Sequence, residues 1–365
     1  MRVVHVGKYY PPEYFGGLES VVMELNDALV KRGVEVTVVC AAVNGKSRTE
    51  SYRGVTVERV ATVTTLLSQP LSPGFGRAVK DARGDLLHLH HPNPLGDTTV
   101  LGDARPLVIT HHSDIVRQRA LRLAYGPLLQ KVHRQARVIV SGSEQLIRTS
   151  SDLKGFESKT RVIPYGIDAS RFAETPGVRA RVKEIRARWD ERPIVLAVGR
   201  LVGYKGFDVL IDAARGLDAT IVIVGQGPEE QRLRELAGPH VSFAGRLNEE
   251  DLVAHYHACD LFCLPSVTIA EAFGMVLLEA MACGKPLITT ALPTGVSAVN
   301  REGVTGLVVP PGDVGALREA LSALLQDAPR RASLGEAASQ VQATEYTAEL
   351  MGERYAKLYE EVLGG

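Results

Sequence analysis

The sequence predicts an α/β protein made of two doubly wound domains, each a parallel sheet covered by helices, with a cleft between the domains. Short runs rich in β-branched residues alternate with amphipathic stretches, which is the pattern of buried parallel strands joined by crossover helices. The alternation stops near the middle of the chain and then begins again. A chain of 365 residues also exceeds the ~100–200 residues of an ordinary single domain.

Ten of these runs are expected to be strands. They lie at residues 3–6, 34–40, 86–90, 107–110 and 138–141 in the first half, and at 194–198, 219–224, 241–243, 261–264 and 286–289 in the second. Each half is therefore expected to be Rossmann-like. After the last of these runs the sequence predicts mostly helix to the end of the chain.

The domain boundary is predicted at the turn Pro164-Tyr165-Gly166-Ile167-Asp168, which is followed by a charged stretch. This divides the chain into an N-terminal domain (1–168), a C-terminal domain (169–344) and a final helix (345–365). The final helix keeps an apolar face that needs a partner surface. We expect it to cross back and pack on the first domain.

Composition excludes several classes of function. The 42 basic residues balance the 42 acidic ones, so no overall charge attracts the protein to nucleic acid. The four cysteines lie in apolar contexts and are expected to be buried, reduced thiols. The first residues read as a strand rather than a signal peptide, and no apolar run reaches ~18 residues. We therefore expect a cytoplasmic protein that touches membranes only with its surface.

The most informative segment runs from Glu271 to Glu279, two carboxylates eight positions apart. Glu271 precedes a predicted helix and Glu279 is expected about two turns along it. Apolar neighbours surround Glu279, so its carboxylate needs either solvent or a fixed polar partner. Gly274 would let a ligand approach the free amides at the helix start, which favour anions. The alternative is an ordinary amphipathic helix with one solvated face.

Two glycine-rich turns are further candidates. The turn from Gly199 to Gly206 carries Arg200 and Lys205, a pair of cations that suits a diphosphate, although such turns are also common on surfaces. In the first half, Gly16-Gly17 leads from a strand into a helix. The dinucleotide fingerprint G-x-G-x-x-G is absent there, and a plain turn is the alternative.

Histidines follow two strands of the first half. His111 and His112 would orient sugar hydroxyls or a developing positive centre, or else cap the next helix. The group His88, His90 and His91 is interpreted as structural, because no second cluster completes a metal coordination sphere; no metal site is predicted.

A basic amphipathic stretch extends from Ile115 to Val140 and includes Arg117 and Arg137. It would touch an anionic membrane, or form a solvated helix face, which is the usual explanation for such runs.

These motifs resemble those of the retaining GT-B glycosyltransferases of family four, a group that includes bacterial polysaccharide, O-antigen and phosphatidylinositol mannosyltransferases. The resemblance spans nearly the whole chain. The motifs that carry it are Glu271-x7-Glu279 with its internal Phe273-Gly274, the turn from Gly199 to Gly206, Val224-Gly225-Gln226-Gly227-Pro228, and Gly306-Leu307-Val308-Val309-Pro310-Pro311.

The resemblance implies a role for each site residue. Arg200 and Lys205 would neutralise the donor diphosphate, Glu279 would bind the ribose, and Glu271 would bind the donor sugar. His112, rather than His111, matches the family's histidine. The remaining implied donor-binding residues are Gly16, Gly17, Gly199, Gly225, Arg246, Leu247, Phe273, Gly274, Met275 and Val276. The sequence departs from the family pattern at Pro293-Thr294-Gly295-Val296, at Asn300 and at Tyr165.

The expected function is transfer of a hexose, with mannose favoured, from a GDP- or UDP-sugar to a glycan or lipid-linked glycan, with retention and without a cofactor or metal. Fixed cations would stabilise the leaving diphosphate. On this basis, alanine at Arg200 or Lys205 is expected to lower turnover far more than stability. A nucleotide-sugar epimerase of the same architecture and a non-catalytic nucleotide-sugar-binding subunit are the alternatives.

Overall fold

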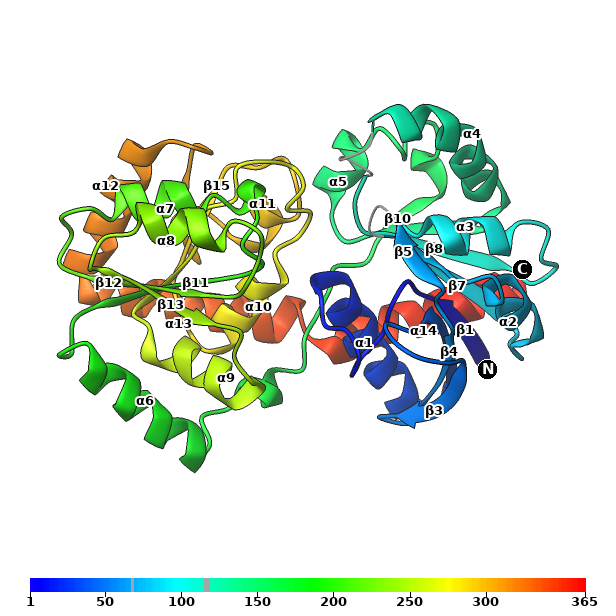
Figure 1. The fold of residues 1–365 in the computed structure, drawn as a ribbon, viewed down its shortest axis with the longest axis horizontal. Helices are drawn as coiled ribbons and strands as arrows, with labels where there is room; N and C mark the ends of the chain where they lie inside the picture. Colours follow the sequence, from blue (N-terminus) through cyan, green and yellow to red (C-terminus); the bar gives the residue numbers. More distant parts are fainter. Residues whose placement is uncertain (67–68, 115–118) are drawn as a thin grey trace. The chain divides into compact units, whose positions relative to one another are not determined.

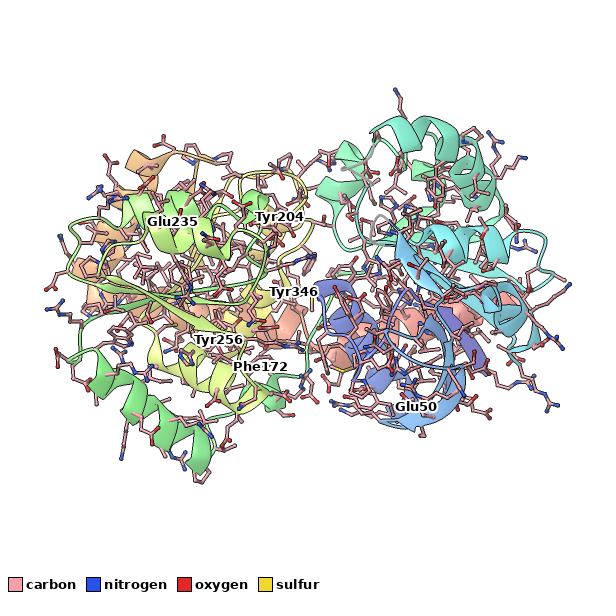
Figure 2. All side chains as sticks on the ribbon, in the orientation of Figure 1. Glu50, Phe172, Tyr204, Glu235, Tyr256 and Tyr346 are labelled. Atoms are coloured by element: carbon pink, nitrogen blue, oxygen red, sulfur yellow. The ribbon has the colours of Figure 1, made fainter. Side chains whose placement is uncertain are left out.

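The computed structural model describes residues 1–66, 69–114 and 119–365, and for residues 119–124 it describes the backbone alone. The chain forms two compact units (Figure 1). The first contains Met1–Gly166 together with Ala348–Gly365, and the second contains Ile167–Thr347. The change of unit at residue 166 lies two residues before the boundary expected from the sequence, and the chain returns to the first unit at Ala348. Side chains fill the interior of each unit (Figure 2).

The first unit is built on an eight-stranded sheet in the order β10-β9-β8-β7-β1-β2-β4-β3. Only β3 runs antiparallel to its neighbour. The five strands expected in this half are present, and three further strands of this sheet were not anticipated. The strands of the sheet are β1 (Arg2–Val6), β2 (Glu35–Ala41), β3 (Arg48–Tyr52), β4 (Val55–Val60), β7 (Leu86–His91), β8 (Leu107–His111), β9 (Val138–Ser141) and β10 (Thr160–Val162). A separate two-stranded antiparallel sheet consists of β5 (Thr64–Leu66) and β6 (Gln69–Leu71).

Helices cover this sheet: α1 (Gly17–Lys31), α2 (Phe75–Asp81), α3 (Pro94–Val100), α4 (Arg119–Gln135), α5 (Glu144–Thr149) and α14 (Ala348–Gly364). The last of these, α14, packs along α1. Gly352 permits the close approach, because a Cβ at this position would lie 2.6 Å from the Cβ of Ala28. The hydroxyls of Tyr355 and Tyr359 reach Thr110 and His88 in the sheet. The C-terminal helix is thus part of the first unit.

The second unit contains a six-stranded, fully parallel sheet in the order β13-β12-β11-β14-β15-β16. Its strands are β11 (Ile194–Val198), β12 (Thr220–Val224), β13 (Val241–Gly245), β14 (Leu261–Leu264), β15 (Leu287–Thr290) and β16 (Gly306–Val309). Numbered within the unit, the order is 3-2-1-4-5-6, so the strand order reverses between β11 and β14. Open α/β sheets bind ligands outside the carboxyl ends of the two strands at such a reversal.

The helices of the second unit are α6 (Pro176–Arg188), α7 (Phe207–Ala213), α8 (Glu230–Leu236), α9 (Glu249–Ala258), α10 (Met275–Ala282), α11 (Val296–Val299), α12 (Val314–Gln326) and α13 (Ala328–Glu345). The sequence placed the last strand at residues 286–289 and helix thereafter; the structure adds β16 before α12 begins. Among the described residues, no helix of either unit combines the length and the apolar character needed to cross a membrane.

Candidate functional site

The loop after β11 brings Lys205 back over the end of its own strand. Gly199 follows β11, and a Cβ there would lie 3.2 Å from Cε of Lys205. Lys205 closes a short 3₁₀ turn, Gly203–Lys205, and Gly206 follows it with a left-handed φ of 68°. A Cβ at Gly206 would also lie 2.1 Å from the carbonyl oxygen of Pro265, in the loop after β14. Glycine is therefore required at position 206 for two reasons: the left-handed turn and the close contact between the two loops.

Lys205 forms a buried ion pair with Glu271, whose loop follows β14. The distance from Nζ to Oε2 is 2.5 Å, and both residues are 8% exposed. The Ser266 hydroxyl donates to the same carboxylate oxygen at 3.0 Å. Burial acts to lower the pKa of Lys205, but the Glu271 carboxylate outweighs it, so the pKa lies above its usual value and the ammonium is charged. A charged pair thus occupies the point where the strand order reverses.

Arg200, the second predicted cation, is in a different environment. Its side chain is exposed, and within the described parts of the chain no ion pair or side-chain hydrogen bond is recorded for it. The sequence suggested that both cations of this turn would face a diphosphate. The structure instead gives one that is buried and already neutralised and one that is free in solvent.

The helix α10 begins just after Gly274, where the sequence suggested its start. Gly274 caps it with a left-handed φ of 81°, which ends the preceding loop, and the helix starts at Met275. Glu279 is the fifth residue of the helix, so it lies about one turn along it and not two. The amides of Met275 and Val276 are among the first of the helix, where backbone N–H groups are available to an anion.

Glu279 has the fixed polar partner that its apolar neighbours require. The Tyr256 hydroxyl, on α9, donates to Oε2 of Glu279 at 2.6 Å. Burial raises the pKa of Glu279, and this hydrogen bond opposes the increase. The two carboxylates of the motif therefore differ: Glu271 is paired with a cation, whereas Glu279 is held by a neutral phenol.

The other predicted donor-binding residues of the second unit lie in loops that follow its strands. Gly225 follows β12 and packs against the first turn, because a Cβ there would lie 1.9 Å from the carbonyl oxygen of Gly199. Phe273 is buried beside Gly295, whose amide donates to the carbonyl of Ala272 at 2.8 Å, so the ring holds this loop in place. Arg246 and Leu247 follow β13, an edge strand two positions from β11.

In the first unit, Gly16 is the N-cap of α1 and Gly17 is its first residue. A Cβ at Gly16 would lie 2.5 Å from Oε2 of Glu19, whereas Gly17 has open space around it. Glu19 is buried, and burial raises its pKa to about 7. Gly16 thus leaves room for the Glu19 side chain beside the start of the helix.

A buried arginine anchors the loop that leads to Gly16. Nothing in the sequence had pointed to this residue. Arg59 lies on β4 with a fully buried side chain. Its guanidinium donates to the carbonyls of Tyr10 and Pro11 at 2.9 and 2.6 Å, and its Nε donates to Glu50 at 2.7 Å. The loop leading to Gly16 is therefore fixed by backbone bonds to one planar cation.

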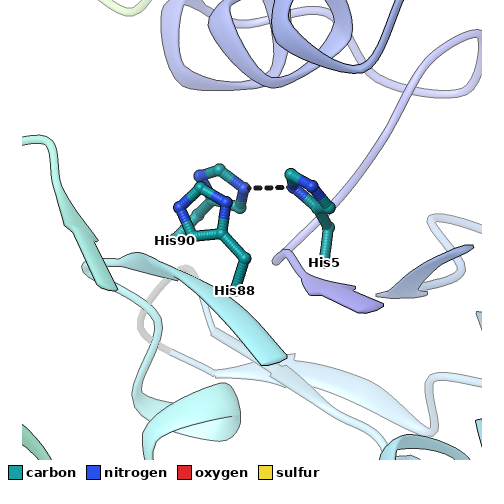
Figure 3. Close-up of side chains that lie close together, drawn as sticks. All are labelled: His5, His88 and His90. Carbon is teal, nitrogen blue, oxygen red and sulfur yellow. Dashed lines mark hydrogen bonds between the residues drawn. The ribbon is translucent and has the colours of Figure 1, made fainter. Parts of the chain in front are cut away.

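His112 is buried and both of its ring nitrogens have partners within the first unit. Nε2 is hydrogen-bonded to Nδ1 of His90 at 3.1 Å, and Nδ1 to the Tyr165 hydroxyl at 2.8 Å. His90 Nε2 is in turn 2.8 Å from Nδ1 of His5 (Figure 3). The placement leaves no ring nitrogen of His112 free for a substrate hydroxyl. His111 has a different partner, Asp114, at 3.0 Å.

Each hydrogen bond in the chain His5–His90–His112 needs one unprotonated ring nitrogen as its acceptor. Burial lowers the pKa of all three, that of His5 to about 3. His5, His88 and His90 are close enough to suggest a metal site. However, the 2.8 Å hydrogen bond between His5 and His90 leaves no room for an ion between these two nitrogens, since metal–nitrogen bonds are ~2.0–2.1 Å each. His88 uses both nitrogens on Thr110 and Tyr359.

Comparison with known families matches both halves of the chain. Residues 15–171 match the model "Glycosyltransferase Family 4", and residues 178–341 match "Glycosyl transferases group 1". Among curated relatives, the D-rhamnosyltransferase WbpZ of Pseudomonas aeruginosa is 34% identical over 343 residues, 92% of this chain and 89% of that protein. The O-antigen chain mannosyltransferase C of Escherichia coli is 33% identical over 375 residues, 100% of this chain and 99% of that protein.

Solved structures show the same fold. Sucrose-phosphate synthase from Thermosynechococcus elongatus superposes with a TM-score of 0.83 at 23% identity, covering 100% of this chain and 99% of that one. HepE of Anabaena in complex with UDP-glucose gives 0.82 at 19% identity, covering 99% and 100%. With two Rossmann-like units, a charged site at the strand reversal of the second and relatives along the full length, this chain belongs to the family 4, group 1 glycosyltransferases of GT-B fold.

Proposed function

We propose that this glycosyltransferase transfers mannose from GDP-mannose to a glycan or lipid-linked glycan during synthesis of a cell-surface polysaccharide, with retention of the anomeric configuration. Two relatives that span the chain are named as a mannosyltransferase and a D-rhamnosyltransferase. D-Rhamnose is 6-deoxymannose, so the two sugars share one ring configuration. Shorter matches include enzymes named as GDP-mannose-dependent.

The observation that carries the donor site is the Lys205–Glu271 pair at the strand reversal. In this proposal, the departing diphosphate gains charge as the sugar bond breaks, and Lys205 and Arg200 stabilise it together with the first amides of α10. Glu271 holds hydroxyls of the sugar, and Glu279 holds the ribose. Protein cations supply the charge that a divalent metal supplies elsewhere, so no cofactor or metal is required.

The ion pair gives the reaction a defined starting state. Before the donor binds, Glu271 neutralises Lys205 in a site that is almost completely buried. The ammonium is therefore not left as an unpaired buried charge, which would destabilise the protein. When the diphosphate arrives, Lys205 shares its donors between phosphate and carboxylate. An ammonium has three N–H donors and one bond to Glu271 leaves two of them for the ligand.

A donor screen tests the proposal. Purified protein is incubated with GDP-mannose, GDP-D-rhamnose, UDP-glucose or ADP-glucose, with and without a mannose-terminated lipid-linked glycan, and products are separated by chromatography. We expect GDP-mannose to be consumed fastest, only with acceptor, and to give an α-linked product. Preference for another nucleotide would refute the donor. Conversion of the donor alone into an epimer would identify an epimerase, and binding without turnover under every condition would identify a non-catalytic subunit.

We further propose peripheral contact with an anionic membrane through the basic stretch at residues 115–140, at the cytoplasmic face where nucleotide sugars are made. Lys131, Arg134 and Arg137 are exposed. Arg117 lies outside the described residues, as do the side chains of Arg119 and Arg122. Flotation with vesicles tests the contact: binding is expected to phosphatidylglycerol and not to phosphatidylcholine, to weaken with salt, and to weaken in K131E/R134E. Equal binding to both lipids would refute it.

A further inference from the structure

Tyr256 is a buried phenol whose position is determined by packing. It lies on α9 with no exposed surface, and its ring contacts Phe172 at 6.2 Å and Phe262 at 5.7 Å between centroids. Figure 2 labels Tyr256 and Phe172 in the second unit. A tyrosine side chain has only two torsions before its hydroxyl, so rings packed on both sides leave the oxygen little freedom.

The hydroxyl reaches one oxygen of Glu279, at 2.6 Å from Oε2. Within the described residues, no hydrogen bond is recorded to the other oxygen, Oε1. Burial and the neighbouring carboxylate raise the pKa of Tyr256 far above its usual value, so the phenol keeps its proton and acts as a donor. A carboxylate held at one oxygen by a donor that does not ionise has a fixed orientation and one acceptor available.

The surroundings indicate what that acceptor receives. Glu279 is on α10, whose first turn presents backbone amides, and the charged pair of Lys205 and Glu271 lies at the same strand reversal. Lys205 is near enough to affect the ionisation of Glu279. A ligand whose phosphates meet the amides and Lys205 therefore places adjoining hydroxyl groups within reach of Glu279, and a hydroxyl that donates to a carboxylate forms a short, charge-assisted hydrogen bond.

We propose that Tyr256 is a positioning residue of the donor site, which fixes Glu279 so that its second oxygen accepts a hydrogen bond from a ribose hydroxyl of the nucleotide. The inference rests on the proposed function, because it uses the ribose role of Glu279. It adds a residue 23 positions earlier in the chain, which touches the carboxylate and not the ligand.

The test substitutes Tyr256→Phe, which removes one oxygen and keeps the ring. Binding of GDP and of 2′,3′-dideoxy-GDP is measured by calorimetry. We expect wild type to prefer GDP by about 10- to 150-fold, the range for one hydrogen bond to a charged group. Y256F and E279Q are expected to lose that preference, while kcat at saturating donor falls less than about threefold in Y256F. A merely structural role for the phenol would weaken both nucleotides equally.

Tyr346→Phe is the matched control, since it removes another hydroxyl of the second unit, one that donates to the backbone carbonyl of Ala298 at 3.1 Å. It should keep the preference for GDP. If E279Q loses the preference and Y256F keeps it, the role of Tyr256 is refuted and that of Glu279 stands. If E279Q keeps it, the ribose role fails first. Should Y256F unfold, E279D serves instead, because the shorter acid withdraws from the phenol while retaining its charge.

Discussion

Replacing Lys205 by alanine should cost the protein folding stability as well as activity. From the sequence we expected turnover to fall far more than stability at both Arg200 and Lys205. The structure separates the two, because Lys205 is 8% exposed and paired with an equally buried Glu271, whereas Arg200 is exposed. The difference between their burial gives each variant a distinct expected result.

The magnitude follows from what K205A leaves behind. Glu271 would remain in a buried site, with the Ser266 hydroxyl as its recorded hydrogen-bond donor among the described residues. Removing one partner of a buried pair typically costs about 3–5 kcal/mol, because the other charge is uncompensated. Arg200→Ala removes a solvated side chain, and such surface changes usually stay within about 0.5 kcal/mol. For activity, the loss of one cation at the leaving group is expected to lower kcat/KM by about 10²- to 10³-fold in either variant.

Urea denaturation followed by circular dichroism measures the unfolding free energy, and initial rates with GDP-mannose measure kcat/KM. The double variant K205M/E271Q is the control, since it removes both charges while keeping similar volumes. It should regain most of the stability lost in K205A yet remain inactive. An unfolding free energy of K205A equal to that of wild type would refute the buried pair. Activity near the wild-type level in either single variant would remove that residue from the donor site.

Three further outcomes are expected. Arg59→Met should lower the unfolding free energy, measured with urea, by about 3–5 kcal/mol, because Glu50 and two loop carbonyls lose a buried cation. Arg59→Lys should recover little of this stability, because lysine lacks the planar guanidinium. An unchanged urea midpoint in Arg59→Met would contradict this. Stability should fall as pH drops below about 6.5, since burial lowers the pKa of His5 to about 3 and the unfolded chain then binds the extra proton. Each such histidine should cost about 1 kcal/mol between pH 6.5 and 5.5, and denaturation curves that coincide at the two pH values would exclude it. Chelator should leave turnover unchanged to within about twofold, and a loss restored by Mg²⁺ would overturn the metal-independent mechanism.

The strands that the sequence revealed are those buried on both faces. The runs at β11 and β12 consist almost wholly of β-branched and other apolar residues, whereas those at β1, β7 and β8 combine such residues with histidines; the structure buries all five almost completely. The strands missed lie at or near sheet edges. The sequence of β3 is RTESY and that of β10 is TRV, in which exposed polar residues replace the apolar pattern. Pairing with a neighbour, and not local pattern, makes these segments strands.

The same limit applies to the site. Glu271, Glu279 and Lys205 lie in recognisable local motifs, so spacing and residue type were enough to select them. Tyr256 and Arg59 have no such signal: each acts on a partner 23 or more positions away, and the distances exist only after the sheet has formed. His112 is the opposite case. Its motif predicted a residue that binds the substrate, but in the structure His90 and Tyr165 occupy both of its ring nitrogens.

The two carboxylates of the 271–279 segment therefore do different work, and their partners explain why. A carboxylate beside a charged lysine can exchange part of that contact for a sugar hydroxyl. Burial raises the pKa of Glu279 and the hydrogen bond from the neutral phenol opposes the increase. Among the described residues this carboxylate has no cationic side chain bonded to it, so it can accept from a ligand hydroxyl at its second oxygen. Between the two lies Gly274, whose left-handed turn starts α10 and presents its amides to anions. Along the chain, Glu271 comes first, the amides of α10 follow, and Glu279 comes last. This order matches the order of chemical groups in a nucleoside diphosphate sugar, which is sugar, phosphates and ribose.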